Sequence, residues 1–297
     1  MNKHKLVQDN PLRAWPFYGC LGLGMIAVSW SLNWAVHGYR THLCFFPLWL
    51  GYCLVVDAWT KVRKGTSLAS RSRKGYIVLF VISMMAWWLF EAINDRTRNW
   101  EYLGVQYFNA ASYFLFSSLN FSTVMPAVFG TAELAGTFRW IQRFRKSIML
   151  MPSPSTLKIL FGASIVMFIL TMTWPRYFFP FIWIALYCCL EPVNAWLGNR
   201  TLLDDLAHGD WRPMIALWTG VAVCGFFWEM WNYYSYPKWV YHLPYFNFLN
   251  IFEMPLPGYI GYLPFSMELF ALFHFMKGLT GFKMSLELIP DSTEPEA

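Results

Sequence analysis

The sequence predicts an all-α integral membrane protein, with about eight transmembrane helices arranged as two parallel four-helix repeats. Three observations lead to this fold class: the chain is very apolar, its apolar stretches are long, and the same motifs occur in both halves. Of its 297 residues, 57% are hydrophobic and only 13% are charged, whereas soluble domains are about a quarter charged.

Eight segments are long and apolar enough to cross a hydrocarbon core of about 30 Å as α-helices. The expected spans are Phe17–Val36, His42–Thr60, Tyr76–Asn94, Tyr107–Ala135, Leu157–Thr173, Tyr177–Gly198, Pro213–Ser235 and Ile251–Met276. The first span has no small-residue cleavage site after it, so we interpret it as a retained anchor.

The last span contains Pro255, Pro257 and Pro264 after Glu253, so it cannot be one straight α-helix. Broken backbone at membrane depth is tolerated where it is buried in protein or lines a cavity. Glu253 has no acidic counterpart in the first half, where Leu115 stands, which indicates that the second half is the specialised one. A kink without function is the alternative.

The net charge of +6 is explained by membrane topology, and no nucleic acid is expected as a partner. With the N-terminus in the cytoplasm, all but five of the 23 lysines and arginines lie on the cytoplasmic side. The five on the opposite side are Arg40, Arg96, Arg98, Arg176 and Lys238. This positive-inside distribution predicts a multi-pass protein of the cell (inner) membrane with both termini cytoplasmic.

The six cysteines lie in or beside apolar helices, without the spacing of metal ligands. We therefore expect neither disulfides nor a metal site, and no motif in the chain indicates a cofactor.

Motifs recur in the same order in the two halves. The matching pairs are 45–49 with 178–183, Asp57 with Glu191, Phe90-Glu91-x-x-Asn94 with Trp228-Glu229-x-x-Asn232, Trp100-x-Tyr102 with Trp239-x-Tyr241, Tyr107-Phe108-Asn109 with Tyr245-Phe246-Asn247, and Pro126 and Glu133 with Pro264 and Glu268. This order predicts a duplication, and four helices per repeat give both halves one orientation about an axis along the membrane normal. The expected units are a first repeat over 1–137, a basic cytoplasmic linker over 138–156, a second repeat over 157–279 and a loose cytoplasmic tail over 280–297.

Carboxylates inside the membrane are the main candidates for function, because each is costly to bury there. Glu and Asn spaced i, i+3 share one helix face and can converge on one partner. The candidate catalytic residues are the pairs Glu91/Asn94, Glu191/Asn194 and Glu229/Asn232, together with Glu253 and Glu268. Such side chains could hold an ion, a polar headgroup or a proton. The alternative is hydrogen bonding between helices that only holds the bundle together.

Aromatic residues make up 20% of the chain. Rings beside the acids could bind substrate, because ring faces stabilise cations and accept flat, apolar molecules. The candidate substrate-binding residues are Trp228, Trp231, Phe227, Phe252, Trp88 and Tyr259. Core packing is the alternative for these rings, and an interfacial belt is the alternative for Trp100, Trp140, Trp211 and Trp239.

From Arg176 to Phe275 the chain has a Pro- and aromatic-rich helix ending in a carboxylate, then Asp210-Trp211 on a short loop, then a helix with Glu229 among aromatics. In these features it resembles the membrane-type lycopene cyclase domain family of bacteria, archaea and fungi. This chain lacks the paired Glu-Glu flanked by Pro and Phe that marks the family, and its units have four helices rather than three. The resemblance implies tandem helical units and an enzyme that cyclises carotenoid ends without net redox change.

We therefore expect a membrane-embedded enzyme that acts by acid/base catalysis on a long apolar isoprenoid (carotenoid-like) or a related lipid, as a cyclase, isomerase or hydratase. A Glu in an apolar aromatic site can stay protonated near neutral pH and protonate an alkene.

Two other functions fit the same residues: a proton-coupled transporter and a non-catalytic membrane scaffold. A water-filled path from Glu191 or Glu268 to one surface would favour the transporter, and an apolar pocket would favour the enzyme.

Overall fold

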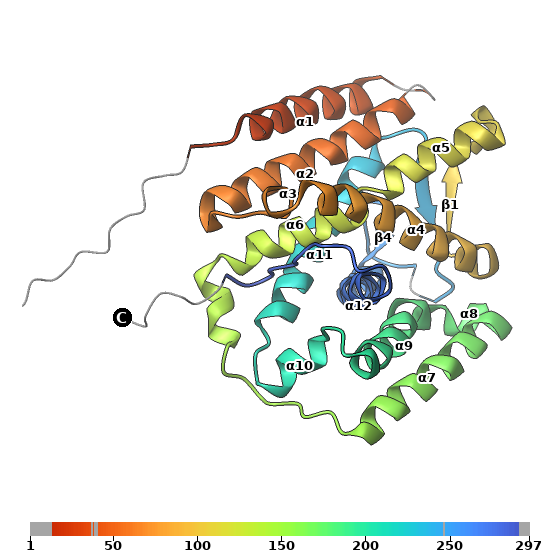
Figure 1. Cartoon of the computed structure of the whole chain (residues 1–297). Coiled ribbons are helices and arrows are strands. Elements are labelled where there is room, and N and C mark those ends of the chain that lie inside the picture. The colour runs from red at the N-terminus through yellow and green to blue at the C-terminus, as the bar shows by residue number, and fades with distance from the viewer. Residues whose placement is uncertain (1–13, 37, 39–40, 246, 291–297) are drawn as a thin grey trace, which may run out of the picture.

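The structure is a computed structural model that describes residues 14–290 except 37, 39, 40 and 246. Of the features named above, Arg40, Phe246, the first thirteen residues of the first repeat and the part of the predicted tail from residue 291 lie outside the described residues. The described chain is mostly helical, with short strands near one end of the helix bundle (Figure 1).

The helices and strands of the chain up to residue 144 are α1 (Phe17–Ala35), α2 (His42–Lys64), α3 (Leu68–Arg71), α4 (Arg73–Thr97), β1 (Trp100–Leu103), η2 (Val105–Tyr107), α5 (Ala110–Phe121), α6 (Val124–Gly136) and η3 (Arg139–Phe144). The rest of the chain forms α7 (Pro154–Thr173), α8 (Pro175–Phe178), η4 (Phe179–Phe181), α9 (Ile182–Leu197), α10 (Leu202–Ala207), α11 (Arg212–Tyr233), β2 (Lys238–Tyr241), β3 (Asn250–Ile251), β4 (Met254–Pro255), η5 (Leu256–Gly261) and α12 (Tyr262–Thr280).

Within the described residues, six helical segments are long and apolar enough to cross a membrane. They are His42–Lys64, Arg73–Thr97, Ala110–Gly136, Pro154–Thr173, Pro175–Leu197 and Arg212–Tyr233. They agree with six of the eight expected spans and with an all-α membrane protein. The expected first and last spans correspond to α1 and α12, which are 19-residue helices outside this set of six.

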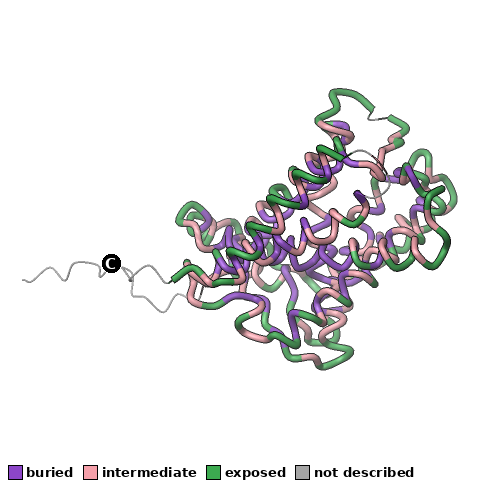
Figure 2. The backbone as a smooth tube through the Cα atoms, turned by 90° about the horizontal axis from the view of Figure 1, so that it is seen from above, coloured by how far each residue is buried: buried purple, intermediate pink, exposed green. Residues whose placement is uncertain are grey.

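The outer helices expose apolar side chains that a soluble protein would cover. On α7 only Ser164 and Thr171 are buried, while Ile159, Val166 and Ile169 are exposed. A helix that is apolar on all sides is stable against lipid rather than water. Figure 2 shows that exposed residues lie mostly on the outside of the bundle and buried residues mostly within it.

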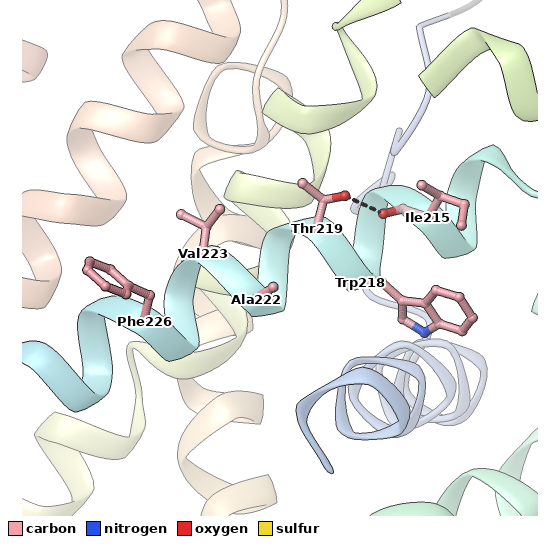
Figure 3. Close-up of a pocket in the computed structure, with 6 residues that line it drawn as sticks. All are labelled: Ile215, Trp218, Thr219, Ala222, Val223 and Phe226. Carbon is pink, nitrogen blue, oxygen red and sulfur yellow. Dashed lines mark hydrogen bonds between the residues drawn. The ribbon is translucent and has the colours of Figure 1, made fainter. Parts of the chain in front are cut away.

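The outward face of α11 is also apolar. A shallow groove along it is lined by Ile215, Trp218, Thr219, Ala222, Val223 and Phe226 (Figure 3). The Thr219 hydroxyl donates to the Ile215 carbonyl at 2.7 Å, so its hydrogen bond is made inside the helix, as contact with lipid requires.

Small residues let helices approach closely, as is common in membrane bundles. A Cβ atom added at Gly22 on α1 would lie 2.7 Å from the Gly51 carbonyl on α2. A Cβ atom at Gly220 on α11 would lie 2.7 Å from the Ala132 nitrogen on α6, so this contact joins the two halves of the chain.

The expected span Tyr107–Ala135 corresponds to the single candidate span Ala110–Gly136, which is interrupted between α5 and α6. Ser83 on α4 stabilises the division: its hydroxyl donates to the Phe121 carbonyl at 2.7 Å and accepts from the Met125 N–H at 3.0 Å. A side chain on a neighbouring helix thus satisfies backbone groups that the break leaves free.

The region after Asn250 is likewise not one helix, as its prolines predict. It forms the β3–β4 hairpin and the 3-10 helix η5 before α12 begins at Tyr262.

Residues 282–290 correct the expectation of a loose tail, since they pack against the helix ends. Met284, Leu286 and Leu288 are buried. Between them, the Glu287 N–H donates to the Glu133 carboxylate at 2.8 Å, and its own carboxylate pairs with Lys64 at 3.0 Å. Apolar residues in alternation with an acid can therefore anchor an extended segment.

Candidate functional site

A two-stranded antiparallel ribbon, one strand from each half of the chain, follows the ends of α4 and α11 (Figure 1). Its register pairs Trp100 with Tyr241 and Tyr102 with Trp239. Because alternate strand residues share one face, these four aromatic side chains lie on the same side of the ribbon. They form one wall of a cavity.

The cavity has a volume of about 440 Å³ and is lined by residues from both halves. Trp87 and Phe121 contribute from the first half, and Trp183, Trp228 and Phe265 from the second. The broken segment before α12 also lines it, through Met254, Pro257, Gly258 and Gly261. None of the described residues in its wall is charged, so the cavity suits an apolar molecule.

Glu91 lies behind the first-half wall and accepts hydrogen bonds from three aromatic side chains. The donors to its Oε1 atom are Trp87 Nε1 at 2.9 Å, Trp100 Nε1 at 3.1 Å and Tyr102 Oη at 2.5 Å. All three donors line the cavity. A carboxyl group is therefore connected to the cavity through rings rather than exposed in it.

Glu229 has the matching place in the second half and is fully buried. Its Oε1 atom accepts from Tyr241 Oη at 2.8 Å and Tyr262 Oη at 2.7 Å. Trp239 Nε1 donates to the Tyr241 hydroxyl at 2.9 Å, which extends the chain of hydrogen bonds along the ribbon. The Oε2 atom of Glu229 has no hydrogen-bond partner among the described residues.

The tyrosines of the ribbon keep their protons. Burial, and then the neighbouring carboxylates of Glu91 and Glu229, raise the pKa of Tyr102 and of Tyr241 well above its ordinary value. Each hydroxyl therefore remains a hydrogen-bond donor at physiological pH.

The two carboxyl sites differ in the sizes of two residues. The second half has Gly225 and Tyr262 where the first half has Trp87 and Val124. Gly225, one helical turn before Glu229, lies against Tyr262: an added Cβ atom would be 2.7 Å from its ring. In the first half, Trp87 stands one turn before Glu91, and Val124 lines the cavity. Gly225 thus leaves room for Tyr262 to reach Glu229, where the first half uses the Trp87 indole.

The asparagines of two Glu-x-x-Asn pairs position the ribbon. Asn94 Nδ2 donates to the Trp100 carbonyl at 2.8 Å, and its Oδ1 accepts from the Asn99 N–H at 2.9 Å. Asn232 similarly donates to the Trp239 carbonyl at 2.8 Å and accepts from its N–H at 3.0 Å. Neither is in the cavity wall, so each acts on the site through the ribbon.

Asp57 and Glu191 bind the first turns of short helices. Asp57 accepts from the N–H of Ala69 in α3, and Glu191 accepts from the N–H of Leu203 in α10, both at 2.9 Å and both 12 residues along the chain. A carboxylate is stabilised at a helix N-terminus, and it accepts hydrogen bonds from backbone N–H groups that have no partner within the helix. These two acids lie outside the cavity wall and hold the loops that follow their helices.

Glu268 and Asn194 connect α9 to α12. Glu268 accepts from the Leu186 N–H at 3.1 Å, and Asn194 donates to the Ala271 carbonyl at 2.8 Å. Glu253 forms an ion pair with Lys238. None of these candidates lies in the cavity wall.

Of the six candidate substrate-binding rings, Trp228 lines the cavity. Trp231 and Phe227 pack with Tyr52. Trp88 bonds to Ser118, and Phe252 packs on Tyr233. The hydroxyl of Tyr259 donates to the Ile251 carbonyl. These five rings are outside the cavity wall.

Sequence reasoning missed several rings that line the cavity, namely Trp87, Trp100, Tyr102, Trp183, Trp239, Tyr241 and Tyr262. The Trp-x-Tyr motif in both halves was the available signal. In a strand, residues two apart point the same way, so the motif could have indicated a shared aromatic wall. An interfacial belt on helices was the competing interpretation.

No group of three or more His, Cys, Asp and Glu residues in the described part of the chain is placed to hold a metal ion. Comparison with protein families, with curated proteins and with solved structures finds no match for this chain.

Proposed function

We propose that this protein is a membrane-embedded enzyme that acts by acid/base catalysis on a long apolar isoprenoid or a related lipid, isomerising, cyclising or hydrating an alkene. One observation carries the proposal: an uncharged aromatic cavity is bordered by two carboxyl groups, each of which accepts a hydrogen bond from at least one tyrosine in its wall. The resemblance to the membrane-type lycopene cyclases points to the same class of chemistry.

Glu229 is the proposed acid. When it is protonated, its proton passes to the Tyr262 oxygen while the Tyr262 hydroxyl proton moves to an alkene carbon in the cavity. The π electrons form the new C–H bond and leave a cation on the neighbouring carbon. The faces of Trp183, Trp228 and Trp239 stabilise that cation.

Glu91 is the proposed base. A proton leaves the carbon next to the cation for the Tyr102 oxygen, and the Tyr102 hydroxyl proton passes to Glu91. One proton enters the substrate and one leaves it, so the product is a double-bond isomer, or a ring if the cation first attacks a second alkene. Neither outcome requires an oxidant or a reductant.

The test is turnover in a host that accumulates an acyclic carotenoid or another polyprenyl lipid, read by chromatography. Glu229→Gln and Tyr262→Phe should each lower turnover by about 10²–10⁴-fold, because neither variant can pass the proton on. Glu101→Gln is the matched control, because Glu101 is exposed and outside the cavity wall. Wild-type turnover in Glu229→Gln would refute the mechanism.

The proposal extends to the fold, as two parallel four-helix repeats with both termini cytoplasmic. Its support is the symmetric register of Trp100 with Tyr241 and Tyr102 with Trp239, and the equal 12-residue steps from Asp57 and Glu191 to the short helices. The proposed axis that relates the repeats runs along the membrane normal. It would pass between β1 and β2, perpendicular to the ribbon that they form. The ribbon would then lie flat across the outer end of the bundle, with the cavity beneath it.

A further inference from the structure

The wall of the aromatic cavity contains an asparagine whose polar atoms are unused. Asn99 precedes β1 and is only 2% exposed. Both Nδ2 and Oδ1 of its side chain are buried without a hydrogen-bond partner in the described part of the chain. A buried amide left in this state destabilises the folded chain, because its polar atoms have lost their hydrogen bonds to water. No contact among the described residues compensates for this loss.

A second amide, Asn120, lies in the same wall at the end of α5, and no other described residue hydrogen-bonds its side chain. Every other described lining residue is apolar or a glycine, or carries an indole or a phenol. The tyrosine hydroxyls there are already donating to Glu91 and Glu229. The indoles of the wall can only donate, so the side chains that can still both donate and accept a hydrogen bond are the two amides, Asn99 and Asn120, both on the first-half side.

We infer that the cavity binds a lipid with an uncharged hydroxyl end, held by Asn99 while its prenyl chain lies among the rings. This inference rests on the proposed function for the apolar part of the ligand. A hydroxyl both donates and accepts, so it pairs with Oδ1 and Nδ2 of one amide. A ketone would satisfy only Nδ2.

A phosphate or carboxylate headgroup does not fit this site. No Lys, Arg or His among the described residues lines the cavity, and an unpaired charge is strongly disfavoured in apolar surroundings.

The volume limits how much of the ligand the cavity holds. At about 30 Å³ for each water-sized group, 440 Å³ holds roughly fifteen non-hydrogen atoms. The cavity thus accommodates the oxygenated end and the first few isoprene units, and a longer chain extends out of it toward lipid.

The experiment measures binding without turnover, by quenching of tryptophan fluorescence in the full-length protein in nanodiscs. The probes are farnesol, farnesylacetone, farnesene and farnesyl diphosphate. Farnesol should bind about tenfold more tightly than farnesene, because one well-made hydrogen bond to a buried amide is worth about that factor. Farnesylacetone should lie between them, and the diphosphate should bind most weakly.

Asn99→Leu should abolish the preference for farnesol over farnesene. It should also unfold at the same or a higher temperature than the ligand-free wild type, because an apolar side chain removes unpaired polar atoms. Asn247→Leu is the matched control, since Asn247 is exposed and outside the cavity wall.

Equal binding of farnesol and farnesene by the wild type would overturn the inference, as would tighter binding of the diphosphate or an unchanged preference in Asn99→Leu. The wild-type comparison needs no variant to fold. The outcome is also separate from the proposed catalysis, because Glu229→Gln should keep the preference for the alcohol.

Discussion

At the scale of single residues, the site depends on which side chains reach the two buried carboxyl groups. Tyr262 and Tyr241 share one oxygen of Glu229, whereas Glu91 is contacted by two indoles and one phenol. A phenol can relay a proton between a carboxyl group and the cavity, but an indole N–H can only donate. The Glu229 site therefore has two relay groups, Tyr241 and Tyr262, and the Glu91 site has one, Tyr102.

Gly225→Ala should destabilise the protein by about 1–3 kcal/mol, because the added methyl group overpacks against the Tyr262 ring. Combining it with Tyr262→Val, which copies Val124 of the first half, should cost less than the sum of the two single changes. Thermal unfolding of the three variants measures this coupling. Gly24→Ala is the control, since nothing lies within 4 Å of its added Cβ atom.

If the double variant is destabilised by the sum of the two single variants, Gly225 and Tyr262 do not form one packing unit.

The candidate acids illustrate what a linear sequence conveys about a site. Intramembrane burial singled out Glu91 and Glu229, and both border the cavity through their donors. The same reasoning also selected Glu191 and Glu268, which bind backbone N–H groups instead. Their partners are backbone atoms of loops and helix turns, and side-chain identity carries no information about those.

At the scale of elements, the segment 282–290 closes the end of the bundle opposite the ribbon. Burial acts to raise the pKa of Glu287, but its hydrogen bond to Lys64 and the charges of Lys64 and Arg71 outweigh burial, so its pKa lies below its ordinary value. The ionised carboxylate therefore stabilises the folded chain above the unfolded-state pKa. That stability is lost as the pH falls through the folded-state value.

Glu287→Gln should accordingly lower the unfolding temperature at neutral pH. The difference from wild type should shrink as the pH falls below 4.5, the ordinary Glu value, and should vanish below the lowered folded-state pKa, where the folded wild-type carboxylate is neutral as well. Thermal unfolding at several pH values checks this. A difference that is constant with pH would show that the ion pair with Lys64 is not its source.

Helices could be predicted from apolar length, but only some of their interruptions could. The break between α5 and α6 depends on Ser83, which is far away in the sequence. The broken segment before α12 was predictable, because its prolines exclude a straight helix by themselves. The packing of 282–290 was missed, since three apolar residues in alternation with polar ones resemble an exposed tail.

At the scale of the whole molecule, a buried ion-pair cluster and the ribbon lie at opposite ends of the helices. Lys64 at the end of α2 and Arg71 on α3 meet Glu133 near the end of α6. The ribbon follows the other ends of α4 and α11. In the proposed topology, with both termini cytoplasmic, the cavity lies near the outer face of the membrane.

Labelling of single cysteines tests this placement, in a chain whose native cysteines are replaced. A cysteine at Asn247 should react with an impermeant reagent in intact cells, and one at Ser70 should react only after lysis. Both positions are exposed. Reaction of Ser70 from outside would reverse the topology.

The most direct measurement of the central claim identifies the lipid held in the cavity. Protein purified in mild detergent should carry a prenyl lipid detectable by mass spectrometry, and Val124→Trp should lose it, because the larger ring fills the cavity that Val124 lines. Val166→Trp, on the exposed face of α7, should retain it. The absence of any enriched lipid from the wild type, or equal amounts of it in Val124→Trp, would contradict an isoprenoid-binding cavity.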